Sequence, residues 1–257
     1  MSRWRLVDAD WNGWPEGLSG PDHVRQSSEL GLDGVELGVY DAAVELSPER
    51  LRALPADVPV TDVLLSLPPE RWPGGALSGD VERLVHQVRA CAQVCRDLGL
   101  PVLGLWPGAD PVGADLLLGS RRVVEAAGEI RIALEYKPDT AVATAAEAVA
   151  LCHQVQGLGV LLDTGHAYAA GEDPALVVDQ LGDLLQHVHL GDAALGGSDD
   201  DLPCGRLHDL TALVVALDHS GFAGTASFDL YGAVVNGVAT GFDAVRESRD
   251  HIRSRRR

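Results

Sequence analysis

Apolar residues along this chain occur in two patterns, short unbroken runs and longer stripes that recur every three or four positions. Short apolar runs bounded by Gly, Pro or Asp predict strands that are buried on both faces. Eight such runs are present, at residues 3–7, 33–37, 58–67, 101–106, 130–138, 158–163, 185–190 and 225–230. The pattern therefore predicts eight short strands, each buried in a sheet.

Helical stripes lie between the predicted strands. The clearest covers residues 80–98, where apolar residues share one helical face and Gly99 follows as a C-terminal cap. Ser47 before Pro48, and Thr144 three residues before Glu147, are N-terminal capping signals. Further helices are expected at residues 21–30, 111–127, 144–156 and 209–219, in segments that start at 48 and 174, and at the end of the chain.

Eight strand–helix units in 257 residues predict a single (β/α)8 TIM barrel domain that covers residues 1–257. An open, doubly wound sheet is the alternative, and it usually has a glycine-rich phosphate loop after its first strand. That position here reads Asp8-Ala9-Asp10-Trp11, which favours the barrel. The functional groups of such a barrel are expected at the carboxyl ends of its strands.

The balance of charge narrows the classes of partner. The chain has 38 acidic and 20 basic residues and a net charge of −18, whereas nucleic-acid binding needs clustered Lys and Arg. The N-terminal segment lacks the apolar stretch of a signal peptide, and no apolar run approaches the length of a membrane span. We therefore expect a cytoplasmic protein without nucleic-acid or membrane partners.

Glu135 and Lys137 stand two positions apart at the end of the fifth apolar run, directly before Pro138. Alternate residues of a strand face the same way, so the two side chains are expected side by side at the mouth of the barrel. Lys137 is the only lysine in the chain. A functional pair is one interpretation, and a rim salt bridge between the two residues is the other.

Polar residues that prefer metal ions end the last four predicted strands, in the order Glu135, Asp163, His189 and Asp229. Three carboxylates close together would repel one another, and a divalent cation would remove that repulsion. Mixed oxygen and nitrogen ligands suit Mn²⁺, Mg²⁺, Co²⁺ or Zn²⁺. The alternative for Asp163 is a purely structural cap of the turn that leads to His166.

Five segments resemble, in the same order, the hallmarks of the xylose isomerase-like TIM barrel superfamily. They are ELGLDGVEL at 29–37, IALEYKP at 132–138, LLDTGH at 161–166, HVHLGD at 187–192 and GFAGTASFDL at 221–230. This superfamily includes sugar isomerases, epimerases, inosose dehydratases and AP endonucleases. The resemblance implies that Glu135, Asp163, His189 and Asp229 bind one divalent ion, with Mn²⁺ the first choice. It also implies that His166 touches the substrate or a second metal.

Details of the motifs separate the members of the superfamily. The Glu-x-Lys-Pro pattern at Glu135 resembles the aldose–ketose isomerases, in which the lysine contacts the substrate near its carbonyl. The 3-epimerases usually lack that lysine and carry Glu where this chain has Asp229. The AP endonucleases carry extra histidines after strands three and four, where this chain reads SLP and LWP. The sugar-converting members are therefore the better match.

We thus expect a divalent-metal-dependent sugar isomerase or epimerase, with Glu135, Lys137 and Asp229 as catalytic residues and a sugar or polyol as substrate. One alternative is a metal-dependent lyase or dehydratase that abstracts an α-proton from a keto-sugar or inosose. Another is a non-catalytic barrel that serves as a partner subunit. Barrels of this type commonly assemble, so a homo-oligomer is also expected.

Further candidate contacts to a sugar share a position at or beyond a strand end. They are His166, Arg206, Glu36, Trp11, Trp72 and Trp106. Aromatic faces stack on the C–H faces of sugars, although the same tryptophans would also serve as core at the rim. Arg206 ends a Gly- and Asp-rich loop at 191–206 that has the length of a lid, and it is otherwise a rim arginine. Glu36 is otherwise a satisfied carboxylate inside the barrel.

Overall fold

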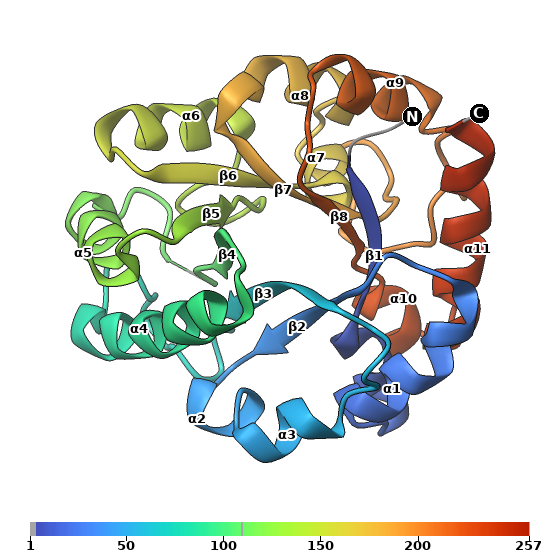
Figure 1. Ribbon diagram of the computed structural model, residues 1–257. Coiled ribbons are helices and arrows are strands. Elements are labelled where there is room, and N and C mark those ends of the chain that lie inside the picture. The colour runs from blue at the N-terminus through green and yellow to red at the C-terminus, as the bar shows by residue number, and fades with distance from the viewer. Residues whose placement is uncertain (1–3, 109, 257) are drawn as a thin grey trace.

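The computed structural model describes residues 4–108 and 110–256, and within them the strands form a closed parallel barrel. Neighbouring strands pair in sequence order, and β8 closes the barrel on β1. Figure 1 shows the helices around the outside of the strands, which confirms the predicted (β/α)8 architecture. The strands are β1 Arg5–Ala9, β2 Val35–Val39, β3 Val60–Ser66, β4 Val102–Trp106, β5 Arg131–Glu135, β6 Leu158–Asp163, β7 Leu185–Leu190 and β8 Thr225–Phe228.

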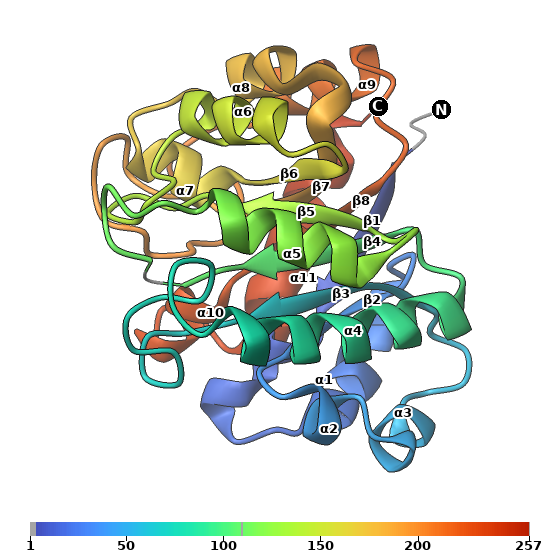
Figure 2. The ribbon, with the colours of Figure 1, turned by 90° about the vertical axis from the view of Figure 1, so that its left-hand side faces the viewer.

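The helices form an outer layer, and Figure 2 shows several of them lying along the strands. They are α1 Gly20–Ser27, α2 Ala42–Glu45, α3 Pro48–Ala53, α4 Val81–Leu98, α5 Leu117–Ala127, α6 Ala145–Gln154, α7 Thr164–Ala169, α8 Pro174–Leu181, α9 Thr211–His219, α10 Tyr231–Val235 and α11 Gly241–Arg255. Three 3-10 helices, η1 Asp10–Glu16, η2 Ser28–Leu30 and η3 Gly182–Leu184, join them. The short helices that directly follow β6 and β8 lie close to the strand ends where the polar residues gather.

The capping signals of the sequence act as expected. The Ser47 side chain accepts a hydrogen bond at the start of α3, and Gly99 ends α4 in the left-handed conformation. Thr144 and Glu147 form a capping box at the start of α6.

Helix α5 begins at Leu117, six residues later than the apolar pattern predicted. The residues before it form a turn, in which the Ala114 amide donates to the Pro111 carbonyl. Gly113, with φ of +81°, has a left-handed conformation that a helix does not allow. The expected start at 111 was therefore wrong because this turn overrides the apolar pattern.

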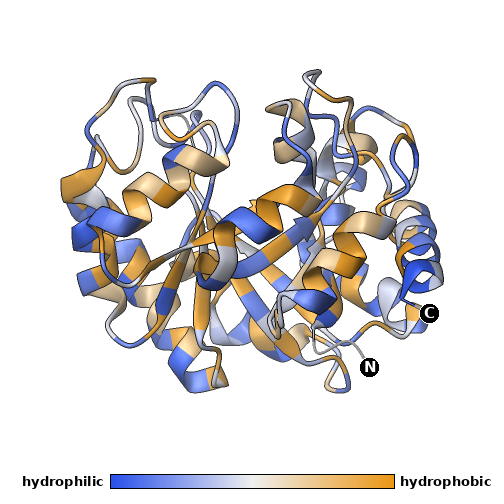
Figure 3. Ribbon diagram, turned by 90° about the horizontal axis from the view of Figure 1, so that it is seen from above, coloured by the Kyte–Doolittle hydropathy of each residue, from blue (hydrophilic) through white to orange (hydrophobic). Residues whose placement is uncertain are grey.

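Apolar side chains pack in two layers on either side of the strands. Figure 3 shows hydrophobic residues along both the strands and the surrounding helices. On β5, Leu134 is fully buried in the large cluster between strands and helices, whereas Ala133 belongs to the small cluster that includes Leu64 and Leu161. The alternation places Glu135 on the same side of the strand as Ala133. The packing of β5 therefore directs the Glu135 carboxylate towards the barrel axis.

No helix within 4–108 or 110–256 is long and apolar enough to cross a membrane. The four cysteines are all buried and none is in a disulfide.

We predict that Leu134→Ala lowers the free energy of unfolding by about 2–5 kcal/mol, because it leaves a cavity between β5 and the helices. The matched control is Leu118→Ala in α5, where the side chain is 66% exposed and the change should cost less than roughly 0.5 kcal/mol. Urea unfolding followed by circular dichroism measures both. An equal loss of unfolding free energy in the two variants would contradict the packing of Leu134 between β5 and the helices.

Candidate active site

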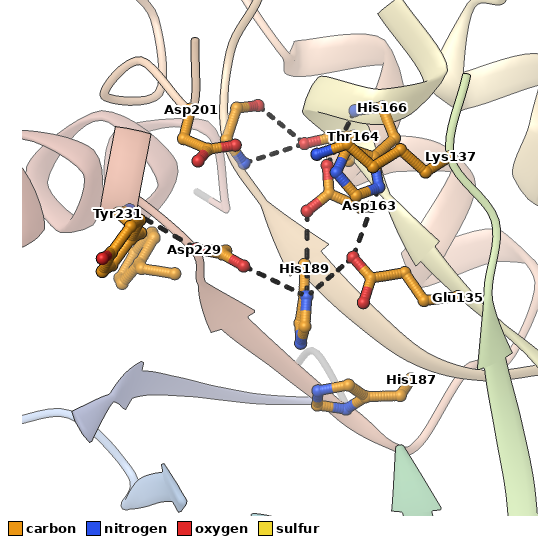
Figure 4. A network of polar contacts seen from close by, with 12 residues as sticks. Glu135, Lys137, Asp163, Thr164, His166, His187, His189, Asp201, Asp229 and Tyr231 are labelled. Atoms are coloured by element: carbon orange, nitrogen blue, oxygen red, sulfur yellow. Dashed lines mark hydrogen bonds and ion pairs between the residues drawn. The ribbon is translucent and has the colours of Figure 1, made fainter. Parts of the chain in front are cut away.

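Four side chains from the ends of β5 to β8 converge inside the mouth of the barrel (Figure 4). His189 Nδ1 lies 3.6 Å from Glu135 Oε1, 3.7 Å from Asp163 Oδ2 and 3.6 Å from Asp229 Oδ2. One ligand atom from each of the four residues lies within 4.8 Å of all the others. The structure thus brings together the four residues that the sequence nominated as a ligand set.

The chemistry of this cluster fits a divalent cation. His189 Nδ1 is buried and has no hydrogen-bond partner among the described residues, although it faces three carboxylates. Burial, together with the charges of Glu135 and nearby Asp199, raises the pKa of Asp163 to about 6, although His166 opposes this shift. Burial likewise raises the pKa of Asp229. A divalent ion would offset the repulsion and take the free imidazole nitrogen as a ligand.

In two carboxylates of the cluster, one oxygen accepts a hydrogen bond from a neighbouring group and the other oxygen faces His189. Asp163 Oδ1 accepts a hydrogen bond from the His166 amide and caps α7, while Oδ2 faces His189. Asp229 Oδ1 accepts from Trp11 Nε1 at 2.9 Å, while its Oδ2 also faces His189. The capping and metal-binding interpretations of Asp163 are therefore compatible, since they use different oxygens.

A cavity of about 450 Å³ opens above the cluster. Of the predicted substrate contacts, Trp11, Trp106 and His166 line it, as do the predicted catalytic residues Glu135, Lys137 and Asp229. The further aromatic lining residues are Trp14, Tyr40 and Tyr231. The cavity therefore presents flat apolar surfaces next to a group of charged side chains, a combination typical of ligand pockets.

Lys137 lies two residues beyond the end of β5, because the chain leaves the sheet at Glu135 earlier than the apolar run suggested. Its Nζ donates to the Asp199 carboxylate at 2.5 Å and lies 5.6 Å from the centre of the Trp106 ring. Burial acts to lower the pKa of Lys137, but Asp199, Asp201 and Glu135 together raise it by more, so the side chain is cationic. The lysine shares the cavity with Glu135 but forms its ion pair with Asp199.

Asp199 and Asp201 were not singled out by the sequence analysis, although they belong to the loop that it described as a lid. Asp199 Oδ2 lies 3.0 Å from His166 Nε2, and Asp201 lines the cavity. Burial and the charges of Asp199, Asp229 and Asp163 hold the pKa of Asp201 well above its usual range. His166, Asp199 and Asp201 form a second group whose ligand atoms lie within 4.8 Å of one another.

His166 is held between acceptors on both ring nitrogens. Nδ1 lies 3.0 Å from the Tyr136 carbonyl oxygen, and Nε2 faces Asp199. Burial acts to lower the pKa of His166, but Asp163, Asp199 and Glu135 together raise it to about 10. The imidazolium form therefore supplies a positive charge among the carboxylates.

Three predicted substrate contacts lie away from the cavity, and these expectations are corrected here. Arg206 forms an ion pair with Glu247 of α11, and 40% of its side chain is exposed. Trp72 is buried beneath the Arg83 guanidinium of α4, 4.1 Å from its ring centre. Glu36 is fully buried below the cavity and hydrogen-bonds to histidines of β7.

The fold and the site define a parallel (β/α)8 barrel protein with a candidate divalent-metal centre at the carboxyl ends of its last four strands. The sequence matches the family model described as xylose isomerase-like TIM barrel over residues 24–255. The chain therefore belongs to this family. Comparison with curated proteins finds no match.

Solved structures of low sequence identity share the fold. D-allulose 3-epimerase from Methylomonas sp., in complex with D-allulose, has a TM-score of 0.74 and 16% identity, covering 99% of this chain and 98% of its own. IOLI protein with a bound zinc atom has a TM-score of 0.70 and 17% identity, covering 98% of both chains. The E. coli 3-keto-D-glucoside 4-epimerase YcjR has a TM-score of 0.68 and 15% identity, covering 98% of this chain and 99% of its own.

We predict that Trp11→Phe weakens divalent-ion binding by roughly 10-fold or more, because it removes the donor that orients Asp229. Trp72→Phe is the matched control, since that ring packs against α4 away from the cluster. Titration calorimetry with Mn²⁺ on metal-stripped protein measures both affinities. Unchanged binding in Trp11→Phe would show that the hydrogen bond does not orient the ligand.

Proposed function

We propose that this protein is a divalent-metal-dependent sugar isomerase or epimerase. The observation that carries the proposal is the convergence of Glu135, Asp163, His189 and Asp229 beneath a cavity whose wall includes Lys137. The shared fold with a D-allulose 3-epimerase and a 3-keto-D-glucoside 4-epimerase supports the same class of reaction.

Glu135, Asp163, His189 and Asp229 would hold the metal through three carboxylates and one imidazole nitrogen. We propose Mn²⁺ as the ion, with Mg²⁺, Co²⁺ and Zn²⁺ as alternatives, because all accept mixed oxygen and nitrogen ligands. A bound divalent ion supplies Lewis acidity, which polarises a carbonyl.

We propose that Lys137 donates a hydrogen bond to the carbonyl oxygen of a sugar in the cavity, and its place among the lining residues, together with Glu135, supports this role. To do so it shares its protons between the sugar and Asp199, its present partner. In a proton-transfer route, Glu135 or Asp229 removes the proton from the carbon next to the carbonyl. In an isomerase, the resulting carboxylic acid returns the proton to the former carbonyl carbon, and a proton moves between the two sugar oxygens. In an epimerase, the other residue of the pair, as a carboxylic acid, donates a proton to the opposite face of the same carbon.

In a hydride-shift route, hydrogen moves directly between the two carbons. The protein's residues then hold the sugar and exclude water rather than exchange protons with it. Isotope exchange with solvent separates the two routes, since only the first passes the hydrogen through a carboxyl group.

The lining of the cavity favours an uncharged sugar or polyol over a phosphorylated one. Carboxylates of Glu135, Asp201, Asp229 and Glu70 line it. Of its basic side chains, Lys137 and His166 already contact Asp199, and the Arg71 guanidinium lies over the Tyr40 ring. A phosphate group would therefore have to compete with Asp199 for two of these side chains. The rings of Trp11 and Trp106 offer stacking faces for the C–H surface of a sugar.

The location, assembly and partners of the protein are also part of the proposal. We propose a cytoplasmic enzyme that forms a homo-oligomer and has no nucleic-acid partner, and the net charge of −18 supports the last point. Light scattering of the purified protein would test the assembly.

We predict that Lys137→Met lowers the rate of aldose–ketose interconversion by about 10²- to 10⁴-fold while the protein keeps its metal, because the lysine acts on the substrate oxygen. Arg206→Gln is the control and should retain the wild-type rate, since Arg206 pairs with Glu247 outside the cavity. The assay is a panel of aldoses and ketoses followed by chromatography, with metal content measured in parallel. Full activity of Lys137→Met would contradict the assigned role.

Product analysis separates the proposal from the lyase or dehydratase alternative. An isomerase or epimerase yields a product of the same mass as its substrate, whereas a dehydratase releases water. Mass spectrometry of the reaction should show no product that is lighter than the substrate by one water molecule. A dehydrated product from the preferred substrate would overturn the isomerase proposal and leave the metal centre in place.

A further inference from the structure

A fully buried carboxylate lies directly beneath the metal-ligand cluster. Glu36 of β2 has 0% exposure, and its Oε2 lies 2.9 Å from His187 Nε2 and 3.2 Å from His189 Nε2. Neither Glu36 nor His187 lines the cavity. Figure 4 shows His187 on the side of His189 away from the three carboxylates. Glu36 therefore contacts one candidate metal ligand from below, out of reach of a substrate.

The hydrogen bond to Glu36 determines which nitrogen of His189 is free. An ionised carboxylate only accepts, so the Nε2 of His189 carries the hydrogen and donates it. In a neutral ring the lone pair is then on Nδ1. That nitrogen faces Glu135, Asp163 and Asp229 at 3.6–3.7 Å, and no other partner lies within 4–108 or 110–256. The lower hydrogen bond thus presents a metal-binding atom to the upper cluster.

His187 holds Glu36 in place for this task. Its Nε2 shares the same Oε2 with His189, and its Nδ1 lies 3.6 Å from Asp62 Oδ1 of β3. The two imidazole rings are nearly perpendicular, at 85°, with centres 5.1 Å apart. Glu36 Oε1 has no partner in the described chain, so the two histidines are the groups that orient this carboxylate.

Glu36, His187 and His189 also have ligand atoms within 4.8 Å of one another, which makes a metal site of their own the competing interpretation. The contacts disfavour it, because both Nε2 atoms are already directed at Glu36 Oε2. The group has one carboxylate instead of three and does not line the cavity. The free Nδ1 of His189, in contrast, faces the upper cluster.

We propose that Glu36 is a positioning residue for the metal centre, which fixes the ring orientation and tautomer of His189 and is itself held by His187. This inference rests on the metal centre of the proposed function. The residue touches neither the metal nor the substrate. It acts by making Nδ1 of His189 the ligand atom.

The test compares divalent-ion affinity in metal-stripped wild type, Glu36→Gln and a matched control. A Gln at 36 accepts through one atom only, and its amide group is a donor, so the His189 tautomer is no longer enforced. We expect Glu36→Gln to bind Zn²⁺ and Mn²⁺ roughly 10- to 100-fold more weakly by titration calorimetry. Asp110→Asn is the control, because Asp110 is a buried carboxylate that accepts from the backbone at 76–78 and does not touch the cluster. Its affinity should match that of wild type.

A second readout is the tautomer itself, followed by ¹H–¹⁵N NMR of the histidines in the zinc-loaded protein. Wild type should show His189 with a protonated Nε2 and a metal-shifted Nδ1, assigned by its absence in His189→Gln. In Glu36→Gln this pattern should be lost or averaged. A purely structural role of Glu36 would lower thermal stability without changing the tautomer.

The outcomes distinguish a failure of the proposed function from a failure of the positioning role of Glu36. If wild type binds no divalent ion, the proposed function fails and this inference fails with it. If wild type binds metal and Glu36→Gln matches it in affinity and tautomer, the positioning role is overturned while the proposed function stands. His187→Gln serves as the second variant if Glu36→Gln does not fold. It leaves Glu36 with one donor, so a smaller loss of affinity is expected, and wild-type affinity would overturn the inference.

Discussion

The mutual repulsion of three carboxylates, two buried and one half-buried, around one imidazole nitrogen is the constraint on which this site depends. Glu135, Asp163 and Asp229 each lie within 3.7 Å of His189 Nδ1. Charges packed this closely in a low-dielectric interior are unfavourable unless a cation joins them. The closed barrel makes the arrangement feasible, because each group is carried by a different strand and hydrogen-bonded strands cannot separate. Trp11 and the amide of His166 hold the outer oxygens and leave the inner ones directed at the cluster.

The surroundings of this cluster divide into a lower and an upper half with different tasks. Below it, Glu36 and His187 are sealed inside the barrel and act on the orientation of His189. Above it, Lys137 lines the cavity and donates to the loop residue Asp199, so a substrate would compete for this hydrogen bond. Thr164 ties the loop to α7, since its hydroxyl donates to the Gly191 carbonyl at 2.6 Å. The lower half sets the ligand geometry, and the upper half faces the cavity in which we propose that a sugar binds.

Sequence patterns predicted those features that follow from strand periodicity. The end of an apolar run locates Glu135, Asp163, His189 and Asp229 at one rim, and the barrel closes them on one point. Loop conformation has no such period, so Asp199 and Asp201 were not found in the Gly- and Asp-rich segment. Arg206 and Trp72 were assigned to the cavity because a rim residue can face either side, and only the described contacts with Glu247 and Arg83 decide. Strand alternation predicted that the Glu36 side chain faces the inside of the barrel. It did not predict how far below the cavity Glu36 lies, and this depth decides whether Glu36 contacts a substrate or His189.

Metal binding by the purified protein tests the central claim most directly. Wild type and Asp163→Asn are stripped with a chelator and titrated with Mn²⁺, since the substitution removes one anionic ligand but keeps an oxygen that can cap α7. The account predicts one tightly bound ion per chain in wild type and none in Asp163→Asn, with both proteins folded. A wild-type protein without affinity for any divalent ion would contradict the account, and so would an Asp163→Asn variant that binds as tightly as wild type.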